Sequence, residues 1–81
     1  MVEDEIRTVL ADHGRLSVDV GALAGTDDLY RNGLTSHASV DLMLALEEQF
    51  GVEFPPHMLR KATFQSIDSI QSAITELTTT A

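Results

Sequence analysis

Residues 36–50 read SHASVDLMLALEEQF, and Gly51 follows them. On a helical wheel of about 100° per residue, roughly one third of the circle collects apolar side chains that we expect to be buried: Leu42, Met43, Leu46 and Phe50. Ser36 is a favourable N-cap residue, and Gly51 is a favourable residue for ending a helix. We therefore expect an amphipathic helix here, at the centre of the fold.

The flanking sequence predicts two further helices. Apolar side chains recur at helical spacing over residues 2–13, and acidic residues fill the first turn. Ser66 is expected to cap a last helix that carries Ile67, Ile70, Ala73, Ile74 and Leu77. Residues 57–61 have room for one or two turns of a short third helix. The fold class predicted is all-α: a four-helix bundle forming one domain over residues 1–81.

The long connection over residues 14–35 is the irregular part of the chain. It contains apolar residues that should hold it against the core: Leu16, Val18, Val20, Leu23, Leu29 and Tyr30. Alternation also allows a strand over residues 16–20, although no partner strand is evident. Loops of this length are usually functional or disordered, and the apolar anchors argue against disorder.

Composition excludes several classes of function. The 81 residues carry a net charge of −8, from 13 acidic and 5 basic side chains, which disfavours nucleic acid and anionic membranes as partners. The charge either serves solubility or attracts basic patches on partner proteins. The absence of cysteine excludes disulfides, a thiolate nucleophile and cysteine zinc sites. Without a signal peptide or a segment of transmembrane length, we expect a cytoplasmic location. We also expect a monomer.

The helix over residues 36–50 has a second apolar patch. Val40 and Leu44 lie together, away from the buried stripe, and share their side with acidic residues: Asp41, Glu47 and Glu48. Ser36 and His37 lie at the N-terminal end of this side. The pair either contacts the long loop or the last helix, or forms a docking surface with an apolar centre and a charged rim.

Ser36 also has two interpretations. As an N-cap alone it would stabilise the helix by about 1 kcal/mol and have no chemistry. As a modification site it would place a phosphodiester against free backbone N–H groups and the positive end of the helix dipole. Gly33 allows a tight turn before it, so that a transferase could reach the hydroxyl.

Two stretches, DLYRNGLTS at residues 28–36 and VDLMLALEEQFGVEFP at residues 40–55, resemble the acyl carrier protein family. The resemblance spans the whole chain and implies a four-helix bundle. It also implies that Ser36 receives phosphopantetheine from coenzyme A through a phosphopantetheinyl transferase. The terminal thiol of this arm would then carry an acyl or aminoacyl group as a thioester. By this resemblance the protein is a carrier and not an enzyme.

Two departures from the family pattern bear on the cargo. The usual Asp-Ser-Leu is Thr35-Ser36-His37 here. The spacing from Asp28 through Gly33 to Ser36 is similar to peptidyl carrier domains and to free-standing carriers loaded by synthetase-like ligases. We therefore favour an aminoacyl cargo. The alternatives are a carrier for specialised fatty acid or polyketide synthesis, and an unmodified acidic adaptor.

The partners expected are the transferase, an acid- or amino-acid-activating ligase and a downstream acyl-accepting enzyme. The residues predicted to recognise these partners surround Ser36 and follow it along the helix: Thr35, His37, Val40, Asp41, Leu44, Glu47 and Glu48.

Catalysis and metal binding are both disfavoured near Ser36. Ser36 and His37 are adjacent, but neighbours in sequence rarely reach nucleophile–base geometry. His37 and Asp41 lie one helical turn apart, and two ligands do not make a structural metal site. Residues 28–39 only faintly resemble a calcium loop, because Tyr30 and Ser39 occupy ligand positions. No catalytic residue and no metal ligand is predicted.

Overall fold

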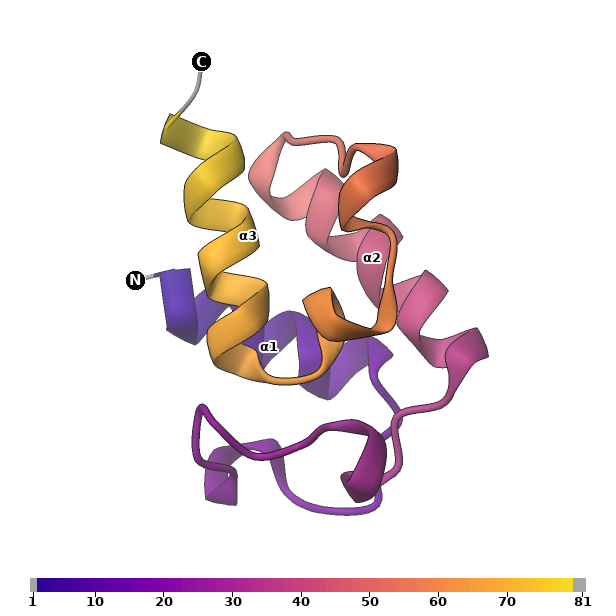
Figure 1. The fold of residues 1–81 in the computed structure, drawn as a ribbon. Coiled ribbons are helices and arrows are strands. Elements are labelled where there is room, and N and C mark those ends of the chain that lie inside the picture. Colours follow the sequence, from indigo (N-terminus) through magenta and orange to yellow (C-terminus); the bar gives the residue numbers. More distant parts are fainter. Residues whose placement is uncertain (1, 80–81) are drawn as a thin grey trace.

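The computed structural model describes residues 2–79, which form an all-α fold (Figure 1). Its α-helices are α1 (Val2–His13), α2 (Ser36–Phe50) and α3 (Ile67–Thr79). Four short 3₁₀ turns lie between them: η1 (Val20–Ala22), η2 (Tyr30–Asn32), η3 (Pro56–Met58) and η4 (Lys61–Phe64). The bounds of α1 and the C-terminal end of α2 agree with those predicted. Among the described residues no helix is long and apolar enough to cross a membrane.

The predicted four-helix count is corrected to three α-helices within residues 2–79. The segment expected to form a short third helix, residues 57–61, belongs instead to two separate 3₁₀ turns. Pro55, which precedes another proline, is extended with φ −70° and ψ 162°, and η3 begins at Pro56. Arg60 is again extended, with φ −145° and ψ 161°, and this break prevents one continuous helix.

The hydrophobic core is centred on α1, which packs against both α2 and α3 (Figure 1). The largest fully buried side chains come from all three helices and one loop: Ile6, Leu10, Leu29, Leu42, Leu46, Ile67, Ile70 and Ile74. Within the stripe predicted on α2, Leu42 and Leu46 are fully buried, whereas Met43 and Phe50 are only half-buried. Phe54 and Phe64 are also buried in the core, where their rings make an edge-to-face contact with centroids 5.4 Å apart.

The long loop over residues 14–35 is held to the body by hydrogen bonds as well as by apolar anchors. Leu29 donates its N–H to the Gln65 carbonyl at 2.7 Å, and Asp68 donates its N–H to the Gly25 carbonyl at 3.0 Å. Arg7, on α1, donates through Nη1 to two loop carbonyls, those of Val20 and Leu23, at 2.9 Å each. The loop is therefore a packed part of the structure, as its apolar residues predicted.

The optional strand over residues 16–20 does not form. The Asp19 carboxylate accepts the Gly21 N–H at 3.0 Å and so begins the turn η1 at Val20. Val18, expected to anchor the loop, is 41% exposed instead. A local side-chain hydrogen bond replaces the strand because residues 16–20 have no partner strand to pair with.

Arg7→Met should lower the free energy of unfolding by about 2 kcal/mol, because two loop carbonyls lose a charged donor. Urea denaturation followed by circular dichroism measures this. The matched control is Arg31→Met, which removes a side chain that is 87% exposed and should change stability by less than about 0.5 kcal/mol. Equal losses in the two variants would contradict the role assigned to Arg7.

Candidate functional site

The N-terminus of α2 is capped by Thr35 and not by Ser36. Thr35 is extended, with φ −99° and ψ 165°, and its Oγ1 accepts the Ala38 N–H at 3.0 Å. The predicted cap at Ser36 is therefore wrong by one residue. Threonine and serine both cap helices well, so the burial of neighbouring residues decides which of the two is the cap. Leu34 and Ala38 are both buried, and this fixes the rotation of the first turn of α2.

The shift makes Ser36 the first residue of α2 and leaves its side chain exposed. Two neighbouring hydroxyls are engaged: that of Thr35 in the cap, and that of Ser39, which donates to the Ser36 carbonyl at 2.7 Å. Within residues 2–79, the Ser36 hydroxyl makes no hydrogen bond. It is the one hydroxyl of the three that is free to react.

Gly33 supplies the turn that leads into α2, as predicted. Its φ is 109°, a value that side-chain-bearing residues rarely adopt. A Cβ there would lie 2.8 Å from the Ser17 backbone nitrogen. Both conditions require glycine, so the approach to Ser36 is a tight turn held against residue 17.

The predicted recognition residues on α2 are mostly accessible. Val40 and Leu44 are 51% and 54% exposed, so neither side chain belongs to the core. His37 and Glu48 are also exposed. Asp41 is half-buried, and its Oδ2 lies 3.9 Å from Arg15 Nη2, a weak surface ion pair.

Glu47 has a structural contact that the sequence did not indicate. Its Oε2 accepts the Phe54 N–H at 2.9 Å, which ties the segment after α2 back onto the helix. One carboxylate oxygen is thus engaged within the protein, although the residue lies on the side of α2 where it was expected.

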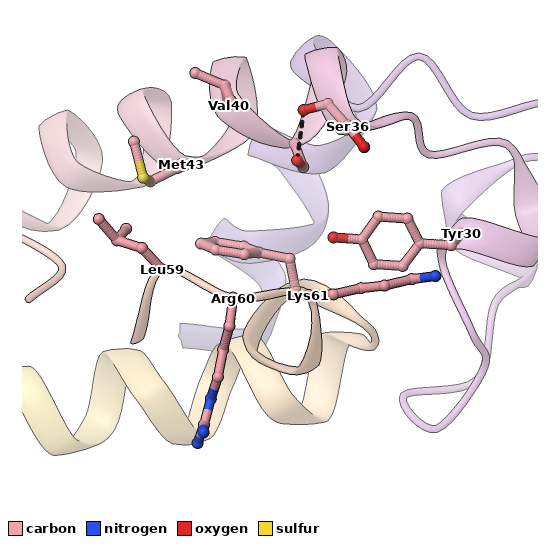
Figure 2. Close-up of a pocket in the computed structure, with 9 residues that line it drawn as sticks. Tyr30, Ser36, Val40, Met43, Leu59, Arg60 and Lys61 are labelled. Atoms are coloured by element: carbon pink, nitrogen blue, oxygen red, sulfur yellow. Dashed lines mark hydrogen bonds between the residues drawn. The ribbon is translucent and has the colours of Figure 1, made fainter. Parts of the chain in front are cut away.

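A cleft of about 370 Å³ opens beside Ser36 (Figure 2). It lies between α2, the turn η2 and residues 59–64, which include η4. Its lining is Tyr30, Ser36, Ser39, Val40, Met43, Leu59, Arg60, Lys61 and Phe64. Leu59 is 50% exposed. Sequence reasoning missed the cleft, because its walls come from three separate segments. The adjacent cations Arg60 and Lys61 in so acidic a chain are the one available signal.

Tyr30 lines the end of this cleft near Ser36, and its hydroxyl points toward α2 (Figure 2). Partial burial raises the pKa of the Tyr30 hydroxyl, a side-chain hydrogen bond with Ser39 lowers it, and the charge of Asp28 raises it; the net shift is upward. The phenol is therefore neutral at physiological pH. Lys61 Nζ lies 4.8 Å from the centroid of the Tyr30 ring, a cation–π contact.

Among residues 2–79, no three or more side chains of the kinds that bind metal ions come together. The free hydroxyl, the tight turn before it and the adjoining cleft are the features that remain to be explained.

Comparison with known families shows which family the chain belongs to. The family model of the phosphopantetheine attachment site matches residues 4–74. This chain belongs to the phosphopantetheine carrier-protein family. The family match confirms that the protein is a carrier of phosphopantetheine and not an enzyme, as the sequence resemblance implied.

Individual relatives agree with the family. The carrier is 45% identical over 69 residues to the aminoacyl carrier protein of Agrobacterium fabrum, a match that covers 85% of this chain and 83% of that protein.

Solved structures resemble the carrier over nearly its whole length. One is a chain from the crystal structure of an engineered Bradyrhizobium japonicum glycine:[carrier protein] ligase complexed with carrier protein from Agrobacterium tumefaciens and ATP. It has a TM-score of 0.91 at 41% identity and covers 94% of this chain and 99% of that chain. The solution structure of a protein from Agrobacterium tumefaciens has a TM-score of 0.75 at 40% identity. The match covers 95% of this chain and 93% of that chain.

The capping assignment makes a prediction about stability. Thr35→Ala should cost about 1 kcal/mol of unfolding free energy, because the Ala38 N–H loses its acceptor. Ser36→Ala should change stability by less than about 0.5 kcal/mol, because its hydroxyl makes no hydrogen bond within the described residues. Thermal and urea denaturation of the unmodified protein measure both. A larger loss in the Ser36 variant would return the cap to Ser36.

Proposed function

We propose that Ser36 is the attachment site of the phosphopantetheine arm. The observation that carries this proposal is the unengaged, exposed Ser36 hydroxyl between two hydroxyls that are already hydrogen-bonded. Its position at the first residue of a 15-residue helix supports the same conclusion, because free N–H groups and the helix dipole favour a phosphodiester there.

The attachment step requires a transferase and coenzyme A. The Ser36 oxygen attacks the phosphorus atom that bears the pantetheine, and a new P–O bond forms. The pyrophosphate bond on the far side of that phosphorus breaks, and adenosine bisphosphate leaves. The serine proton goes to a base of the transferase, since no side chain within residues 2–79 hydrogen-bonds to the Ser36 hydroxyl.

Ser36→Ala should abolish attachment while leaving helix content unchanged. The test is incubation with coenzyme A and a phosphopantetheinyl transferase, followed by intact-mass measurement. Ser39→Ala is the matched control and should gain the full mass of the arm. An unchanged mass of the wild-type protein would favour the unmodified adaptor, and a modified Ser36→Ala variant would move the site elsewhere.

The cargo that we favour is an amino acid. The proposal is supported by the relative named an aminoacyl carrier protein and by the similar chain bound to a glycine:[carrier protein] ligase, seen also in a structure with AMP. Such a ligase would join the carboxyl of the amino acid to the thiol of the arm, converting ATP to AMP and pyrophosphate. A downstream enzyme would then receive the aminoacyl group. Intact mass after incubation with candidate amino acids identifies the cargo.

The partner surface that we propose is the exposed side of α2. Val40 and Leu44 form its apolar centre, and His37, Asp41 and Glu48 form its polar rim. The acidic rim would attract basic partner enzymes at long range, and the apolar pair would contact them on docking. Thr35 and Glu47 lie beside this surface, and each also makes a hydrogen bond within the protein.

Leu44→Lys should reduce the rate of transfer from a ligase to the arm by about tenfold at limiting carrier concentration, equivalent to about 1.4 kcal/mol. Val18→Lys is the matched control, because Val18 is a 41% exposed apolar residue in the long loop. Both variants should keep the wild-type unfolding midpoint. If Leu44→Lys unfolds, or if it transfers at the control's rate, α2 is not the docking surface.

Three further expectations remain predictions. They are a cytoplasmic location, a monomeric state and a single carrier domain over residues 1–81. Size-exclusion chromatography with light scattering tests the second directly.

A further inference from the structure

A groove between α1 and α2 lies apart from the cleft beside Ser36 and shares no lining residue with it. Its volume is about 650 Å³. One wall is the C-terminal half of α1, which includes Asp12. The other wall is the side of α2 that carries Asp41, Leu44 and Glu48. The groove therefore joins part of the proposed partner surface to a second helix.

The groove is acidic, and its carboxylates are almost unpaired. The side chains of Asp12 and Glu48 make no ion pair or hydrogen bond within residues 2–79. Asp41 has only the weak ion pair with Arg15, at 3.9 Å. Among the described residues, neither lysine nor arginine lines the groove, and its one titratable nitrogen base is His13. A cation brought by a partner would therefore meet three carboxylates without breaking a strong internal contact.

Two of these carboxylates lie where they are unfavourable for the fold. Asp12 is in the last turn of α1 and Glu48 is in the last turn of α2. The negative end of a helix dipole disfavours an anion at both places. Neither side chain makes a polar contact within residues 2–79 that would offset this cost. Their positions therefore favour a role in binding over a role in stability.

The spacing along α2 defines the shape of a matching partner. Asp41, Leu44 and Glu48 follow one another at i, i+3 and i+7, so they form one line along the helix. With a rise of about 1.5 Å per residue, the two acidic positions are about 10.5 Å apart along the helix axis. Leu44, which is 54% exposed, lies between them. A matching helix presents two cations two turns apart, with an apolar side chain between them.

We propose that this groove is the docking site for a basic amphipathic helix of a partner enzyme. Lysine or arginine side chains of that helix would bind Asp12, Asp41 and Glu48, and an apolar side chain would contact Leu44. The inference rests on the proposed partner surface of α2 and extends that surface to α1. An amphipathic helix that lies in a groove is a recurrent mode of protein recognition.

Arg15 shows that the groove accepts a cation at one end. Its guanidinium lies against Asp41, although the Arg15 side chain is 70% exposed. A cation of the partner would replace Arg15 there, and exchanging one exposed ion pair for another costs little. The internal pair is thus a stand-in for the contact that we propose.

The first measurement uses the unmodified full-length protein and a synthetic helical peptide as the probe. The peptide has a lysine at every seventh position, a leucine midway between successive lysines and alanine elsewhere. A control peptide has the same composition with its lysines adjacent. Binding is followed by NMR of the isotope-labelled carrier. The variants are Asp12→Asn and, as the matched control, Glu76→Gln, which removes an exposed carboxylate from α3.

We expect the probe to shift the backbone signals of Asp12, Leu44 and Glu48, and the control peptide to bind more weakly. Asp12→Asn should weaken binding of the probe by about two- to fivefold, and Glu76→Gln should leave it unchanged. The unfolding midpoint of Asp12→Asn should not fall below that of the wild type, because the variant removes an anion from a helix C-terminus.

The second measurement is transfer from a ligase to the arm. Asp12→Asn should raise the KM for the carrier by about two- to fivefold at low salt and leave kcat unchanged. The difference from the wild type should disappear near 1 M salt, which screens the charges.

The groove would be refuted by a probe that binds Asp12→Asn and the wild type equally, or that shifts signals only elsewhere. If Leu44→Lys slows transfer while Asp12→Asn has the wild-type KM, docking is confined to α2 and the inference fails alone. Normal transfer in both variants would refute the proposed partner surface as well.

Discussion

The hydrogen bond from the Ala38 N–H to Thr35 Oγ1 determines where α2 begins, and the arrangement around Ser36 depends on it. With the cap at Thr35, the next hydroxyl in the chain is left without a structural task and faces solvent. The same boundary places Ala38, Leu42 and Leu46 toward the core, because they follow at helical spacing. One short contact thus separates the residue that stabilises the helix from the residue that is available for chemistry.

The cleft depends on contacts between segments that are far apart in sequence. The long loop brings Tyr30 to α2, and the backbone bond from Leu29 to Gln65 joins that loop to the end of η4. Lys61 then lies over the Tyr30 ring. The extended backbone at Arg60 separates two turns and lets the side chains of neighbouring residues diverge. A continuous helix there would have placed them differently, so the missing fourth helix is part of how the site is built.

The parts of the structure that were predicted correctly are those set by short-range contacts. The bounds of α1, the stop at Gly51 and the cap at Ser66, whose Oγ accepts the Ser69 N–H at 3.1 Å, follow from residues within one or two turns. Where two neighbouring residues were equally suited, as Thr35 and Ser36 are for capping, local propensity could not choose between them. The cleft was beyond prediction because Tyr30, Val40 and Lys61 meet only through tertiary packing. Val18 is exposed and Val20 is buried for a similar reason, because the Asp19 side chain begins a turn between them.

The position of Tyr30 has a practical consequence for studying this carrier. The chain contains one tyrosine and no tryptophan, so its near-ultraviolet absorption and emission come chiefly from a single phenol. That phenol lines the cleft beside Ser36 and lies against the ammonium group of Lys61. The absorption and emission of Tyr30 should therefore change when the cleft is occupied. Changes there are observable in dilute solution without an added label.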